Sequence, residues 1–249
     1  MAGHSKWKQI KHYKAATDAK RGALFTKLIR EITMAAKLGG GDPNGNARLR
    51  TAIDAARQNS MPKENIERAI KKGTGDLEGV NYQDVTYEGY GPGGVAIIIA
   101  ALTDNPTRTV ADVRHKMSRG GGNVGAQNSV AWMFDRKGQL TIDATKYGED
   151  ATLEAALDAG AEDFARDGDV YVVTTEPAMI HNVKAALEAR RIAVAQTEPV
   201  VMVPKNTVKV EGKTAESLLR LLEELEDMED VQKVWANFDM DVADMANAG

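Results

Sequence analysis

The spacing of apolar residues changes near residue 76, and this change limits the possible folds more than any other feature of the chain. Before it, apolar residues recur three or four positions apart, which is the period of amphipathic helices. After it, short apolar runs such as Val95–Leu102 alternate with helical segments, and glycine-rich turns separate them. The pattern predicts an N-terminal helical part followed by mixed α and β structure.

Local signals place three helices in the N-terminal part. The first is expected from about Thr17 to Leu38, and the glycines at 39–41 end it. The second spans Ala47–Gln58 behind an Asn46 cap. The third begins at Pro62, and Gly73 is expected to close it. Helices in so short a stretch predict a small bundle with a thin core.

The remainder of the chain predicts two α+β domains. Residues 138–204 hold a nearly complete β-α-β-β-α-β set, and the segments 82–137 and 205–240 hold half a set each. We therefore expect an α+β fold class, with an N-terminal three-helix domain and two ferredoxin-like domains, the middle one discontinuous. The expected domains are residues 1–76, residues 77–137 plus 205–240, and the inserted residues 138–204.

Two further segments are similar as strands. Val130–Phe134 reads VAWMF and Val234–Phe238 reads VWANF, so both are expected to be strands of one sheet.

Charge is segregated along the chain, although the formal net charge is only −4. Residues 1–76 hold 16 Lys and Arg against 7 Asp and Glu, whereas residues 205–249 hold 5 against 11. Such asymmetry favours a polyanionic partner for the basic end. The alternative is a set of lysine-rich helix surfaces that only face solvent.

The basic end begins with a dense run of cations that can neutralise phosphates and release counterions. Trp7 and His12 lie within this run, where they either stack on bases or, for Trp7, anchor the segment to the bundle. The candidate nucleic-acid-binding residues are Lys6, Trp7, Lys8, Lys11, His12, Lys14, Lys20, Arg21, Lys27, Arg30, Arg48, Arg50, Arg68, Lys71 and Lys72.

Sequence-specific reading of duplex DNA is the weaker interpretation of these residues. The turn at residues 59–61 resembles that of a helix-turn-helix motif. However, the third helix offers mainly Lys, Arg and Glu, with only Asn65 suited to reading adenine. Phosphate-dominated or RNA binding is therefore favoured.

Other chemistry has little support in the sequence. There is no cysteine, the four histidines are far apart, and no coherent catalytic set is found, so we expect no enzyme activity, metal or cofactor. Gly120–Gly125 fits G-x-G-x-x-G, but it follows a helix and precedes a strand, which indicates a turn. Gly91–Gly94 is likewise expected to be a hairpin turn. No apolar run is long enough for a membrane span, and a cytoplasmic location is expected.

Several motifs together resemble the YebC family. They are MAGHSKW at 1–7, DAKRG at 18–22, FTKLIREI at 25–32, GGGDPN at 39–44, NIERAIKKGTG at 65–75, YEGYGP at 87–92 and SVAWMF at 129–134. The resemblance covers nearly the whole chain and is densest over residues 1–135. It implies three domains, the second discontinuous, and no known catalytic activity. One departure is Gln127-Asn128, which stands where the resemblance predicts a glycine before Ser129.

Family members are usually labelled probable transcriptional regulators in bacteria, and mitochondrial relatives activate translation. Charge and resemblance together predict a nucleic-acid-binding regulator of gene expression, most simply a translation factor directed to RNA or the ribosome. The alternatives are a DNA-binding transcriptional regulator and, more remotely, a small-molecule enzyme with its site between domains. The lack of an evident dimer zipper in the sequence favours RNA over DNA, and a monomer is expected.

Overall fold

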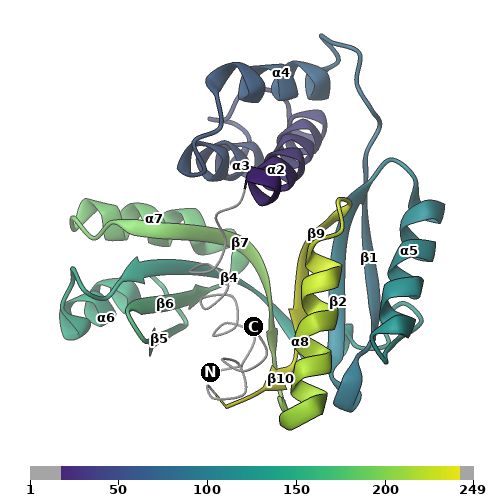
Figure 1. The fold of residues 1–249 in the computed structure, drawn as a ribbon. Helices are drawn as coiled ribbons and strands as arrows, with labels where there is room; N and C mark the ends of the chain where they lie inside the picture. Colours follow the sequence, from purple (N-terminus) through teal and green to yellow (C-terminus); the bar gives the residue numbers. More distant parts are fainter. Residues whose placement is uncertain (1–17, 242–249) are drawn as a thin grey trace. The chain divides into compact units, whose positions relative to one another are not determined.

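The computed structural model describes residues 18–241, with the side chains from residue 21 onward (Figure 1). Contacts between residues divide the chain into two units. One unit is Phe134–Lys205, and the other holds the rest of the described chain on both sides of it. Each unit is described by itself below.

The second unit begins with the three expected helices. They are α2 (Asp18–Gly39), α3 (Ala47–Gln58) and α4 (Lys63–Thr74). Their core includes Ile32, Leu49, Ala56, Ile66 and Ala69, all buried. Asn46 caps α3 as expected, because its side chain accepts a hydrogen bond from the backbone N–H of Leu49.

The expected end of the third helix is wrong by two residues. Gly73 lies inside α4 at its contact with α2, where a Cβ atom would stand 2.3 Å from the Thr33 carbonyl oxygen. Gly75 ends the helix instead, with a φ of 87° in the left-handed region. Gly73 therefore allows α4 to pack closely against α2, and Gly75 ends α4.

The same unit continues with a four-stranded sheet. Its strands are β1 (Gln83–Tyr90), β2 (Ala96–Thr103), β3 (Asn123–Val124) and β9 (Val231–Ala236), in the order β3-β1-β2-β9. All neighbouring pairs are antiparallel. The β1–β2 turn contains the short 3₁₀ helix η1 (Pro92–Gly94), so the expected hairpin at the Gly-Pro-Gly-Gly segment is confirmed. Two short strands, β8 (Val208–Lys209) and β10 (Phe238–Asp239), form a separate two-stranded parallel sheet.

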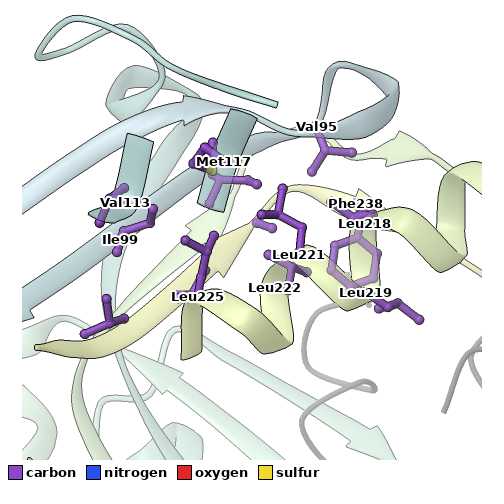
Figure 2. Close-up of a cluster of buried hydrophobic side chains, with 14 of the residues drawn as sticks. Val95, Ile99, Val113, Met117, Leu218, Leu219, Leu221, Leu222, Leu225 and Phe238 are labelled. Atoms are coloured by element: carbon purple, nitrogen blue, oxygen red, sulfur yellow. The ribbon is translucent and has the colours of Figure 1, made fainter. Parts of the chain in front are cut away.

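Two helices bury one face of this sheet: α5 (Pro106–Arg119) and α8 (Gly212–Glu226). Figure 2 shows Leu218, Leu221 and Leu222 of α8 beside Met117 of α5 and Ile99 of β2. The leucines recur at three- and four-residue spacing, so one stripe of α8 is apolar and packs inward. The polar stripe of α8, which includes Lys213, Glu216 and Arg220, is exposed.

The inserted unit is a ferredoxin-like fold. Its elements are β4 (Phe134–Asp143), α6 (Glu149–Asp158), β5 (Asp163–Asp167), β6 (Val170–Thr175), the 3₁₀ turn η3 (Pro177–Met179), α7 (Ile180–Ala189) and β7 (Val194–Pro204). The sheet order is β5-β6-β4-β7, all antiparallel, which is the order of a β-α-β-β-α-β unit. The expected fold class, an N-terminal helical part followed by α+β structure, is confirmed.

The expected strand at Val130–Phe134 is wrong. Residues 131–133 form the 3₁₀ turn η2, and Phe134 starts β4 in the inserted unit, while Val234 belongs to β9. The two similar segments thus lie in different sheets. The physical cause is Glu88, whose buried carboxylate accepts hydrogen bonds from the backbone N–H groups of Asn128, Val130 and Ala131. These groups are therefore not available to a β ladder.

Candidate nucleic-acid interface

The structure divides the predicted binding residues into groups with different surroundings. Lys6, Trp7, Lys8, Lys11, His12 and Lys14 lie outside the described residues. Lys20 lies in the first turn of α2. The remaining cations belong to α2, α3 and α4, and their burial decides which of them can meet a partner.

Four predicted cations are exposed: Arg21 on α2, and Arg68, Lys71 and Lys72 on α4. Arg50 on α3 is half-buried. Within residues 18–241, none of the five is found in an ion pair or side-chain hydrogen bond. Their charges are therefore available to an external anion.

The three α4 cations form what we call the α4 basic face: Arg68, Lys71 and Lys72. The face exists because Ile66, Ala69 and Ile70 turn toward the helical core, which leaves the intervening positions to solvent. Lys71 and Lys72 stand in the last turn of the helix, where the helix dipole favours positive charge. The nearby Lys63 pairs instead with Glu67 of the same helix, at 3.4 Å.

Arg30 is not part of an exposed surface. Its side chain is 10% exposed, and its guanidinium donates to the carboxylates of Asp230 and Glu229 and to the Leu102 carbonyl oxygen. It also lies 5.4 Å from the centre of the Tyr82 ring. Lys27, one turn earlier on α2, donates from its ammonium group to the backbone carbonyl of Glu226. We therefore leave Arg30 and Lys27 out of the candidate interface, because their charges are used within the fold.

Asp230 is the centre of the network that holds Arg30. Its carboxylate also accepts hydrogen bonds from Thr103, Thr109 and Arg108, and its backbone carbonyl accepts from the Leu102 N–H. Burial alone would raise the pKa of this carboxyl. The hydrogen bonds from Thr109, Arg108 and Arg30 outweigh burial and lower the pKa of Asp230 below its ordinary value.

Arg48 makes a second link between the helices and the sheet. Its guanidinium donates to Glu31 of α2 and to Asp84 of β1. The hydrogen bond to Glu31 is the main cause of a raised Arg48 pKa; burial opposes the rise and Asp84 supports it. Arg48, like Arg30, therefore binds protein carboxylates and is left out of the candidate interface.

The sequence interpretation missed Asp230. It lies between the end of α8 at Glu226 and the start of β9 at Val231, and it is buried. The one signal of its burial in the sequence is its position directly before the apolar strand β9, because a polar residue there lies at the edge of the core. Arg108 follows Asn105, whose side chain caps α5, and it donates to Asp104 and Asp230.

Between residues 18 and 241 there is no cluster of three or more His, Asp or Glu side chains arranged to hold a metal ion. Over the same stretch, every helix is too short or too polar to cross a bilayer.

Comparison with known proteins identifies similar sequences over almost the whole chain. A family model described as the TACO1/YebC protein N-terminal domain matches residues 5–76. A second, described as the TACO1/YebC second and third domain, matches residues 82–238.

Individual relatives agree with these matches. A protein of Gemmatimonas aurantiaca named "Probable transcriptional regulatory protein" is 66% identical over 248 residues and is covered in full, as is this chain. A relative in Desulforapulum autotrophicum with the same descriptive name is 54% identical, with 96% of this chain and 97% of that protein covered. The crystal structure of a conserved hypothetical protein from Aquifex aeolicus has a TM-score of 0.84 at 45% identity, covering 90% of this chain and 92% of the other.

Proposed function

We propose that this chain, which belongs to the TACO1/YebC family, regulates gene expression by binding RNA or the ribosome and acting on translation. The observation that carries the proposal is the α4 basic face together with the excess of cations in residues 1–76. Charge of this kind supplies most of the sequence-independent affinity of a protein for nucleic acid.

The α4 basic face favours RNA over the reading of duplex DNA. A helix that reads bases in the major groove presents amide or guanidinium groups in pairs to base edges. The outer face of α4 presents two lysines and one arginine, while Asn65, its one amide side chain, is half-buried. Lysines act as point charges on phosphates, which suits recognition of backbone and shape.

The alternative is a DNA-binding transcriptional regulator. The printed names of the relatives favour it, since they describe probable transcriptional regulatory proteins. Both candidates use the same cations, so charge alone does not separate them.

Crosslinking in cells separates the two candidates. The protein is crosslinked to its partners, and bound RNA and bound DNA are sequenced from the same culture. Enrichment of ribosomal or transfer RNA without promoter peaks supports the translation proposal and contradicts the DNA alternative. Reproducible promoter peaks without enriched RNA contradict the translation proposal.

Three further features complete the proposal. We infer that the chain works as three domains, residues 1–76, 77–137 with 205–240, and 138–204. We also infer that it acts as a monomer and by binding rather than by catalysis. Sedimentation of the purified protein tests the monomer, because a dimer would double the measured mass.

A further inference from the structure

Two glycine-rich segments that the sequence places far apart line one open groove on the polar side of α8. We call it the α8 groove, and it has a volume of about 990 Å³. Pro92 and Gly93 come from the β1–β2 turn, Gly120 and Gly121 follow α5, and Lys213 to Glu224 come from α8. The groove and all of its lining residues lie in the second unit.

Glycine at position 120 lets the backbone after α5 approach α8 closely. A Cβ atom at Gly120 would stand 2.7 Å from Cδ1 of Leu221. Gly121 next to it has a φ of 79°, which residues other than glycine rarely adopt. The wall of the groove is therefore bare backbone beside a helix, and its charge comes from the side chains around it.

Three exposed cations surround the groove: Arg119, Lys213 and Arg220. In the part of the chain that the structure describes, none of them has an ion-pair partner. The lining also contains two acids, but Glu224 lies 3.9 Å from Lys116, so Glu216 remains the acid set against the three cations. The hydroxyl groups of Thr214 and Ser217 add neutral hydrogen-bond donors.

The charge order along α8 is the reverse of what a helix dipole favours. A helix is stabilised by acids in its first turn and cations in its last. The first turn of α8 has no acid and contains Lys213, while its last turn has no cation and is acidic. Charges placed against the helix dipole in this way are expected mainly at functional sites, where a binding role outweighs the local cost to the helix.

The two ends of α8 differ in how this conflict is resolved. At the C-terminal end, Lys27 of α2 donates to the Glu226 carbonyl, and Arg30 pairs with Glu229 just beyond the helix. At the N-terminal end, the residue before the helix, Glu211, makes no side-chain cap and pairs with Lys209. Positive charge from Lys213 and from the helix dipole is thus left for an anion from outside the described chain.

We propose that the α8 groove binds the phosphate backbone of the same nucleic acid, as a second contact besides the N-terminal helices. This inference rests on the proposed function. Lys213 and Arg220 are seven residues apart, about 10 Å along the helix at 1.5 Å per residue. That separation is too long for one phosphate and suits successive phosphates of a strand lying in an open groove.

A charge-matched pair of full-length variants tests the proposal. The groove variant carries Arg119→Gln, Lys213→Gln and Arg220→Gln. The control variant carries Arg114→Gln, Arg136→Gln and Arg191→Gln, which removes the same charge from exposed positions outside the groove and the N-terminal helices. Affinity for a fluorescent single-stranded RNA is measured over a range of salt concentrations, with circular dichroism as the check of folding.

The groove variant is expected to bind about tenfold more weakly at physiological salt, with a salt slope lower by about 2, since each single-strand phosphate contact contributes about 0.7. The control should keep the slope of the wild type. Equal binding by the two variants, with the wild type still binding RNA, overturns the groove and leaves the proposed function intact. A wild type that binds neither RNA nor DNA overturns both.

Two further measurements identify the position and the source of the phosphate. RNA carrying 4-thiouridine is crosslinked to the wild-type protein, and the attached peptides are identified by mass spectrometry. Crosslinks near Arg119 or Lys213 support the proposal, and crosslinks confined to the N-terminal helices contradict it. Binding of inorganic triphosphate that only the groove variant loses, with RNA affinity unchanged, would assign the groove to a small phosphate ligand and overturn the nucleic-acid contact.

Discussion

Arg30 and Asp230, two hundred positions apart, form a buried ion pair with 2.6 Å between Nη1 and Oδ1. The side chains are 10% and 8% exposed, so neither charge is well solvated. The pair joins α2 of the basic helical part to the start of β9, and Arg48 makes a similar link to Asp84 of β1. The basic residues of the N-terminal helices therefore fall into two groups. Some form ion pairs that join the helices to the sheet, and others are exposed to solvent.

Replacing Asp230 with asparagine should destabilise the fold strongly. The change leaves Arg30 buried without its carboxylate, and loss of one partner of a buried pair costs about 3 kcal/mol. Glu229→Gln is the matched control, because Glu229 contacts the same guanidinium but its side chain is 66% exposed. The control should cost less than about 1 kcal/mol. Urea unfolding of both variants measures the difference, and equal stabilities would contradict the role given to Asp230.

The stabilisation by Asp230 should depend on pH in one direction. Because its pKa in the fold lies below the ordinary value of 3.8, the folded protein binds the proton less readily than the unfolded chain. The stabilisation is thus fully present above the ordinary pKa and is lost as the pH falls through the lowered one. Unfolding free energies of the wild type and Asp230→Asn should converge below about pH 4. A difference that stays constant from neutral pH to pH 3 would show that ionisation is not involved.

Gly73 and Gly22 are both helical glycines, yet alanine should have opposite effects at the two positions. At Gly73 a Cβ would meet the Thr33 carbonyl oxygen at 2.3 Å and force α2 and α4 apart, at a cost of about 1–3 kcal/mol. At Gly22 no atom lies within 4 Å of the added Cβ, and alanine should stabilise α2 by roughly 0.5–1 kcal/mol. Thermal unfolding of the two variants distinguishes the effects. A stable Gly73→Ala protein would mean that the helices separate without cost.

Asn128 occupies the position where a glycine was expected from the family resemblance, and its φ of 65° gives the reason. Asparagine tolerates the left-handed region better than most residues, and glycine tolerates it best. Asn128→Gly should therefore be neutral or slightly stabilising, whereas the β-branched Asn128→Val should cost about 1–2 kcal/mol. Urea unfolding compares the two. Equal stability of the variants would show that the loop does not depend on this conformation.

Sequence alone predicts those elements whose boundaries are set by neighbouring residues. The Asn46 cap and the β-α-β-β-α-β order of the inserted unit are of this kind, because caps and periodicity act over a few positions. It fails where a distant group decides the outcome. Glu88 of β1 accepts hydrogen bonds from the N–H groups of residues 128, 130 and 131, and Asp230 holds Arg30 in a buried ion pair.

The candidate site follows the same division. The outward cations of α4 can be predicted from helical spacing, since they alternate with the buried Ile66 and Ala69. The α8 groove cannot, because its cations come from α5 and α8, which are far apart in the sequence and pack on the same core. The glycine motif at residues 120–125 follows a helix and precedes a strand, so the sequence indicates only a turn there. It does not predict that the backbone of Gly120 and Gly121 lines a charged groove.

The α4 basic face should contribute to nucleic-acid binding in proportion to the charge removed. The change Arg68→Gln, Lys71→Gln and Lys72→Gln removes three exposed cations whose side chains pack on nothing in the helical core, so folding should be preserved. If each cation contacts one phosphate of a single strand, the salt slope of RNA binding falls by about 0.7 per contact. The Arg114, Arg136 and Arg191 variant again provides the charge-matched control. Identical slopes for the α4 variant and the control would locate RNA binding elsewhere on the chain and remove the α4 basic face from the observations that support the proposed function.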